Sequence, residues 1–238
     1  MPGRLSVRLS VGLSRRKYAV LLVLLLVVLA IETMNVRSGA ERLQTDVLRA
    51  ILTVAIWIIV FKRPRERAIT AAMLIASLLA EWGQYFTAAN LDHALSLAYQ
   101  VLLSLFLWSA VWVILRDLFR APVAGPENVF GAICGYLIAG HAWAHANALA
   151  YLLVPSAYSI NSELAALLPD QHGRLALFTY YAFTQVMTIG YSDVTPVGAP
   201  ATTLSLFAAL FGVFYTAVVV SQFVGLAQKS KRDTPARE

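Results

Sequence analysis

The chain has 238 residues, of which 59% are hydrophobic and only 13% are charged. Soluble domains carry roughly 25% charged residues, so this composition excludes an ordinary soluble domain, whose surface would be strongly adhesive. The net charge is +6, but basic residues are almost absent from the apolar blocks. This distribution is typical of the cytoplasmic flanks of a membrane protein and argues against a nucleic-acid partner. The single cysteine, Cys134, excludes a disulfide within the chain.

Long apolar blocks run through the sequence, and their lengths predict membrane-spanning helices. A helix needs about 20 apolar residues to cross a hydrocarbon core of roughly 30 Å. The predicted spans are Tyr18–Thr33, Leu43–Phe61, Ala68–Ala89, Leu95–Leu115, Asn128–Val154 and Gly198–Gln228. The first block is short, and we expect Glu32 to lie at its outer interface.

The basic residues predict how these spans are oriented, because Lys and Arg accumulate on cytoplasmic loops. With the N-terminus inside, most of the 19 basic residues fall in cytoplasmic segments. Those left outside are Arg37, Arg42, Arg49 and Arg174. The pattern therefore predicts a multi-pass protein of the cell (inner) membrane, with both termini in the cytoplasm.

The first apolar block has a second interpretation. Five positive charges, a 14-residue apolar run and the sequence Val28-Leu29-Ala30 also fit a cleavable signal peptide. A chain that begins at Met1 favours a retained helix, and the topology of the other spans is the same in either case.

Pro122, Gly125 and Pro126 separate the first four spans from the last two. We expect a basic cytoplasmic tail at 1–17, a four-helix transmembrane domain at 18–120, a pore domain at 128–228 and a cytoplasmic tail at 229–238. The fourth span, Leu95–Leu115, contains no Arg or Lys, whereas a voltage sensor needs several charges within the membrane field. The four-helix domain is therefore predicted to lack voltage-sensor charges, and no soluble ligand-binding domain is expected after the pore.

The segment between the last two spans is not an ordinary loop. Arg174–Met187 is largely apolar and aromatic but too short to cross a membrane, and a short polar stretch follows it. This order predicts a re-entrant helix and loop, which membranes tolerate where protein or a water-filled cavity surrounds the backbone.

Thr188–Asp193 reads Thr-Ile-Gly-Tyr-Ser-Asp, which resembles the potassium-channel selectivity filter, Thr-Val-Gly-Tyr-Gly-Asp. The resemblance extends back to Tyr180 and Tyr181, where the family has paired aromatics, and forward through Thr195-Pro196 to a mid-span glycine, Gly212. The Gly131–Tyr136 stretch is similar to the outer helix of bacterial two-transmembrane ion-channel modules. The resemblance covers about residues 128–228.

This resemblance implies an all-α membrane protein with a re-entrant pore helix, a filter and a tetrameric pore. A dehydrated cation needs rings of oxygen ligands, and four chains supply the backbone carbonyls of each ring. By resemblance, Thr188, Ile189, Gly190 and Tyr191 present carbonyls to K⁺, and the Thr188 hydroxyl adds to them. The departure is Ser192, where the family has a second glycine. Either Ser192 bears left-handed strain, which we expect, or the outermost ion site is altered.

Asp193 and Gly212 in the pore segment have two interpretations each. In the family, the carboxylate after the filter bonds a pore-helix aromatic, so Asp193 is expected to brace Tyr180 rather than to be simply solvated. Gly212 is either the hinge on which the inner helix bends or, with Ala208, a small-residue packing face. Gly131 and Gly135 are expected to allow close helix packing.

His141 and His145 lie one turn apart in the fifth span, and Glu81 is predicted at similar depth in the third. Intramembrane ionisable groups are functional candidates. A structural contact, including a Glu81–histidine pair, is favoured over pH-sensitive modulation, and both over a metal site, because two histidines make a weak ligand set.

The sequence thus predicts a homotetrameric potassium channel that needs no cofactor or metal beyond the permeant K⁺. A weakly selective monovalent cation channel is the nearest alternative. A six-helix secondary transporter would show inverted repeats between its halves, and none is apparent. A membrane-embedded enzyme using His141, His145 and Glu81 would need a larger cluster of catalytic groups.

Overall fold

The computed structural model describes residues 17–38, 42–84, 86, 89–121 and 126–232. These residues are predominantly helical. The long helices are α2 (Lys17–Ser38), α3 (Arg42–Val60), α4 (Pro64–Gly83), α5 (Ala89–Phe119), α6 (Pro126–Leu153) and α9 (Ala199–Arg232). Between α6 and α9 lie the 3₁₀ turn η1 (Pro155–Ala157), β1 (Tyr158–Ile160), α7 (Ser162–Ala165), α8 (Gln171–Val186) and β2 (Val194–Pro196).

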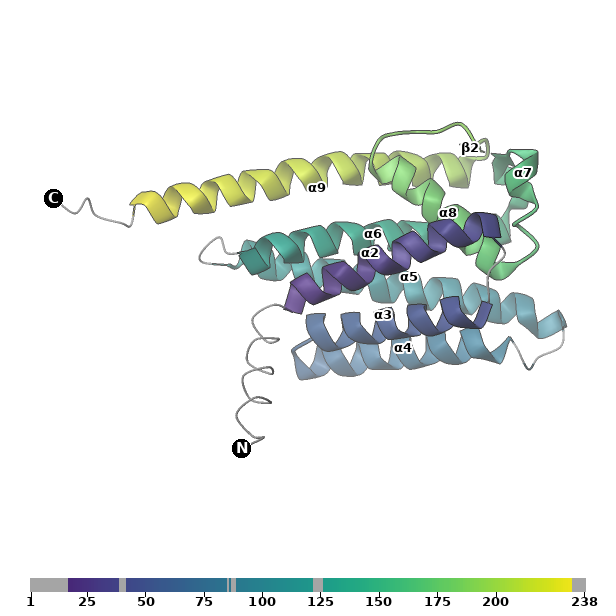
Figure 1. The fold of residues 1–238 in the computed structure, drawn as a ribbon, viewed down its shortest axis with the longest axis horizontal. Coiled ribbons are helices and arrows are strands. Elements are labelled where there is room, and N and C mark those ends of the chain that lie inside the picture. Colours follow the sequence, from purple (N-terminus) through teal and green to yellow (C-terminus); the bar gives the residue numbers. More distant parts are fainter. Residues whose placement is uncertain (1–16, 39–41, 85, 87–88, 122–125, 233–238) are drawn as a thin grey trace.

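The six long helices of the described residues run up and down along one direction (Figure 1). Each overlaps one of the predicted apolar spans, but the third span was predicted to reach Ala89, whereas α4 ends at Gly83 and Ala89 begins α5. The start of α2 and the end of α9 lie at the same end of the molecule, whereas α7 and β2 lie at the other end. Proline occupies the first helical position of α4 and α6, where its missing N–H and fixed φ favour a helix start. Part of the basic N-terminal tail and the end of the C-terminal tail lie outside the described residues.

The outer surface of the helices is apolar. Large exposed hydrophobic side chains occur on every long helix, among them Val23, Ile58, Leu79, Trp112 and Phe214. Water would penalise such a surface, and hydrocarbon would not. Within the described residues, two helices, Leu91–Phe119 and Ala199–Gly225, have both the length and the composition to cross a membrane.

One buried hydrophobic cluster joins the helices on both sides of the predicted domain boundary. It includes Leu21 of α2, Phe106 of α5, Ile138 of α6, Phe178 of α8 and Ala201 of α9. The first helix packs on α3, α6 and α8, so this apolar block forms part of the core. The division into a four-helix domain and a pore domain stays a prediction, because this cluster crosses the expected boundary.

Candidate functional site

The site is built on the short helix α8, which matches the predicted re-entrant segment. The Asp170 side chain caps its start, and Oδ2 accepts a hydrogen bond of 3.0 Å from the Gly173 N–H. Its 16 residues give a length of about 24 Å, less than the hydrocarbon thickness. Apolar side chains from Leu175 to Val186 are buried, so this helix lies inside the fold rather than on its surface.

The chain turns sharply after α8, and the backbone of the turn is tied to the helix end. The Thr184 carbonyl accepts hydrogen bonds from the Ile189 N–H (2.8 Å) and the Gly190 N–H (3.2 Å). Thr188 has φ 58° and Gly190 has φ 65°, and Thr188 is the one non-glycine residue with positive φ in the described part of the chain. This alternation in the sign of φ is the pattern that points successive carbonyls to one side.

Ser192 differs from the expectation. It does not have a positive φ, so the predicted left-handed strain at this residue is wrong. The positive φ angles fall two and four residues earlier, and the chain reaches Asp193 without a left-handed turn at Ser192. The Ser192 side chain is exposed, and within the described residues its hydroxyl makes no hydrogen bond.

A two-stranded antiparallel ribbon holds the chain that follows the filter. Ile160 of β1 pairs with Val194 of β2, and Tyr158 pairs with Pro196. The Asn161 N–H donates to the Asp193 carbonyl at 3.0 Å. The outer end of the filter is therefore fixed to the segment that follows α6.

The predicted brace between Asp193 and Tyr180 is present. The Tyr180 Oη donates to Asp193 Oδ2 at 2.8 Å. Tyr180 lies on α8, and its phenol is the donor because a carboxylate oxygen accepts. Its ring stacks on Tyr191, with centroids 6.2 Å apart. Tyr181 points elsewhere and bonds Ser205 of α9 at 2.6 Å.

Small residues allow the helices around the filter to approach closely. A Cβ on Gly212 would collide with the carbonyl oxygen of Val186, at the end of α8. A Cβ on Gly131 would meet the Tyr18 ring at 3.4 Å, and one on Gly135 would lie 2.6 Å from the Tyr215 hydroxyl. The close packing predicted at Gly135 is therefore present, whereas the contact at Gly131 is an ordinary van der Waals contact. The packing interpretation of Gly212 is supported as well, and its role as a hinge stays a prediction.

The filter segment lies at one edge of the single chain. The loop between α8 and β2 runs along the side of the molecule opposite α3 and α4 (Figure 1). Ile189 is 51% exposed and Tyr191 is 55% exposed. One chain thus leaves one side of this segment uncovered.

Glu32 and Arg49 form a buried ion pair that was not predicted. Glu32 Oε1 lies 2.7 Å from Arg49 Nε, and both side chains are less than a tenth exposed. Glu32 was expected at an outer interface and Arg49 on the outer side. The two side chains are buried against each other near the end of α2 and the start of α3, and their position relative to the membrane stays a prediction. The helix α3 begins at Arg42, so Arg49 lies two turns inside it and faces α2.

The pair of Glu81 with a histidine, which the sequence left open, is not formed among the described residues. His141 Nδ1 lies 3.7 Å from Glu32 Oε2, and His145 Nδ1 lies 2.6 Å from Gln100 Oε1. Glu81 instead accepts a hydrogen bond of 3.2 Å from Tyr99. Each histidine therefore has a structural polar partner on another helix. Within the described residues, no group of three or more His, Cys, Asp or Glu side chains could hold a metal ion.

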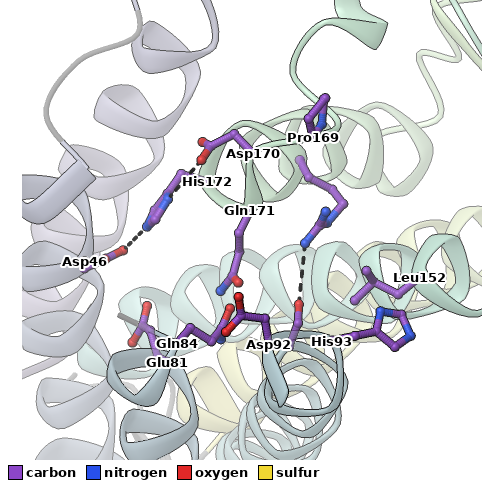
Figure 2. A pocket seen from close by; sticks show the side chains of 12 residues that line it. Asp46, Glu81, Gln84, Asp92, His93, Leu152, Pro169, Asp170, Gln171 and His172 are labelled. Carbon is purple, nitrogen blue, oxygen red and sulfur yellow. Dashed lines mark hydrogen bonds and ion pairs between the residues drawn. The ribbon is translucent and has the colours of Figure 1, made fainter. Parts of the chain in front are cut away.

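An open cavity of about 430 Å³ lies between α8 and the ends of α4 and α5 (Figure 2). His172, on the first turn of α8, contacts Asp46 of α3 through Nε2 at 2.7 Å. Its Nδ1 lies 3.8 Å from Asp170 Oδ1. Glu81 lines the same cavity, together with Gln84 and Asp92. Sequence reasoning missed His172, because no local pattern links it to a residue 126 positions earlier in the chain.

Comparisons with known proteins bear on this segment. Residues 162–229 match the family model described as an ion channel. The match includes α7, α8, the filter segment and most of α9, and it leaves α2 to α6 outside. Neither the search of curated proteins nor the search of solved structures found a match. The ion-channel family is not a family of enzymes. The family resemblance noted at Thr188–Asp193 is therefore supported, and residues 162–229 are similar to an ion-channel segment.

Proposed function

We propose that this chain forms a homotetrameric, potassium-selective channel in the cell (inner) membrane. Four copies would place their Thr188–Tyr191 carbonyls around one axis and replace the hydration shell of K⁺. The observation that carries the proposal is the alternation of φ from Thr188 to Tyr191, in a backbone tied to Thr184 and braced by Asp193. The exposed edges of Ile189 and Tyr191 supply the uncovered side that such an assembly requires.

The six long helices would each span the bilayer, with both termini in the cytoplasm. This topology is supported because the start of α2 and the end of α9 lie at the same end of the molecule. The distribution of basic residues supports it as well. K⁺ is the permeant ion, and we propose no other metal and no cofactor.

A weakly selective monovalent cation channel is the second candidate, and Ser192 favours it. This residue replaces the family's second filter glycine, and its non-left-handed backbone gives the outer mouth another shape. The inner positions Thr188 to Tyr191 are unaffected by this departure, so we place potassium selectivity first.

The test is ion flux from purified protein in liposomes, with K⁺ and Na⁺ gradients compared in the same preparation. Crosslinking in the membrane establishes the number of subunits beforehand. The proposal expects K⁺ flux to exceed Na⁺ flux clearly in a preparation of tetramers. Equal fluxes from tetramers would establish the weakly selective channel, and no flux of either ion would reject both candidates.

A further inference from the structure

The end of the pore helix α8 leaves one carbonyl without a backbone partner. The last carbonyls of any helix lack intrahelical donors. Here Thr184 accepts from two N–H groups, and Gln185 accepts from the Thr188 N–H at 2.9 Å. The Val186 carbonyl receives no backbone hydrogen bond in the described part of the chain. It lies two residues before Thr188, so its position determines where the filter begins.

A side chain from the outer helix supplies the missing donor. The Tyr136 Oη, on α6, donates to the Val186 carbonyl at 3.1 Å. Val186 is 1% exposed, and an unpaired buried carbonyl is costly. This bond therefore fixes the inner end of the filter to α6, at the opposite end from the brace made by Asp193.

The inner helix reaches the same carbonyl. Gly212 of α9 lies so close to Val186 that no side chain would fit between them. The Tyr136 ring also packs against the Tyr215 ring of α9, with centroids 5.5 Å apart. Outer helix, inner helix and pore helix thus meet at one atom, the oxygen of Val186.

Among the described residues, the neighbouring polar side chains are already engaged and do not offer a second donor for the Val186 carbonyl. Tyr136 lines an apolar cavity of about 550 Å³ between α6 and α9, whose other polar side chains are Tyr215 and Thr216. The Tyr215 hydroxyl already donates to the Ala132 carbonyl at 2.6 Å. The Thr216 hydroxyl donates to the Gly212 carbonyl at 2.9 Å.

We propose that Tyr136 is a positioning residue for ion selectivity, which holds the inner end of the filter through the Val186 carbonyl. This inference rests on the proposed function, because selectivity is the property that Tyr136 would tune. Loss of the phenol would let the end of α8 move and would loosen the Thr188 ring, which lies nearest to it.

The experiment compares three Tyr→Phe variants with the wild-type channel in liposomes. Tyr136→Phe removes the bond to Val186 and keeps the ring. Tyr151→Phe is the matched control on the same helix, because its hydroxyl makes no hydrogen bond with the described residues. Tyr215→Phe removes a bond between α9 and α6 but leaves the bond from Tyr136 to Val186 in place. The readouts are the K⁺/Na⁺ permeability ratio and the difference in melting temperature between K⁺ and Na⁺, which reports ion binding to the folded channel.

We expect Tyr136→Phe to lower the K⁺/Na⁺ permeability ratio by about threefold to tenfold, which corresponds to the loss of one hydrogen bond. The same change should reduce the rise in melting temperature that K⁺ causes. Tyr151→Phe and Tyr215→Phe should keep the wild-type ratio, whatever Tyr215→Phe does to overall stability. A wild-type ratio in Tyr136→Phe, or an equal fall in Tyr215→Phe, overturns the inference. Channels with one variant and three wild-type subunits give the same test if the full variant does not assemble. A wild-type channel without selectivity would reject the proposed function instead.

Discussion

The Tyr180 phenol and the Asp193 carboxylate are 2.8 Å apart and join the pore helix to the outer end of the filter. Thirteen residues separate them in sequence, and the whole filter lies between them. Their bond therefore closes a loop around Thr188–Ser192, and the stacked Tyr191 ring lies against the same phenol.

We expect Tyr180→Phe and Asp193→Asn each to weaken the filter. A hydrogen bond to a charged group contributes about 1.5–3 kcal/mol, so either change should lower tetramer stability measurably. The permeability ratio for K⁺ over Na⁺ should fall as well, because the outer end of the filter is released. Melting and liposome flux, with Tyr151→Phe as the control, measure both effects. Wild-type values in both variants would show that the bond does not support the filter.

Gly212→Ala should disrupt the packing of α9 on α8. The new methyl group would collide with the Val186 carbonyl, and a backbone atom cannot rotate away. Overpacking of this kind costs about 1–3 kcal/mol or more. Gly225→Ala, on the same helix, is the matched control, because nothing lies within 4 Å of its added Cβ. It should be neutral or stabilise α9. Detergent melting of both variants is the measurement, and equal stability of the two would contradict the close approach at Gly212.

The parts of this protein that sequence predicted are those with a local pattern. Apolar runs predict long helices because a helix satisfies its own backbone in hydrocarbon. Thr188–Asp193 was recognisable because its backbone chemistry depends on a few consecutive residues. The contact between Tyr180 and Asp193 followed from the family resemblance and not from spacing alone.

The buried polar contacts between helices could not be predicted, because their partners meet only when the helices pack. Glu32 and Arg49 lie on different helices, and a hydropathy average hides a single charge within an apolar block. Asp46 and His172 are 126 residues apart. The role of Gly212 in packing was equally undecided, because the collision depends on where α8 ends.

Ser192→Gly should have little effect. Glycine would relieve left-handed strain at this position, but Ser192 does not have a positive φ. Its hydroxyl makes no hydrogen bond within the described residues, so its removal also costs little. We expect a change within about 0.5 kcal/mol, measured as tetramer melting in K⁺, and an unchanged permeability ratio. A clear rise in both quantities would mean that strain exists in the assembled filter.

The pair of Glu32 and Arg49 should be sensitive to the loss of either partner. Glu32→Gln removes the nearer counter-charge of the buried guanidinium and leaves it with Asp46 at 3.9 Å. Breaking a buried pair costs about 3–5 kcal/mol in comparable sites, and this is the upper end of the expected loss. The double variant Glu32→Leu with Arg49→Met should recover much of this loss, because the guanidinium is removed as well and Asp46 keeps its contact with His172 at 2.7 Å.

Arg63→Gln is the control for that comparison. Its contact with Glu66 is 3.7 Å long and its side chain is 56% exposed, so it should cost less than about 1 kcal/mol. The measurement is the melting temperature in detergent of four proteins: wild type, Glu32→Gln, the double variant and Arg63→Gln. A double variant no more stable than Glu32→Gln would show that the ion pair itself, and not an unpaired charge, is what the fold needs.

Channel opening should depend weakly on voltage. Each elementary charge that crosses the field contributes roughly 2.3 kcal/mol per 100 mV, so steep gating needs several mobile charges per subunit. The helix α5 has no Arg or Lys before Arg116, which lies in its last turn and pairs with Glu66. Arg49 is buried, but Glu32 holds it at 2.7 Å. The measurement is the current in planar bilayers between about −100 and +100 mV, which is roughly the range over which gating charges act. We expect a shallow conductance–voltage curve. A curve that requires several gating charges per subunit would contradict this prediction, because α5 has no Arg or Lys between Leu91 and Leu115.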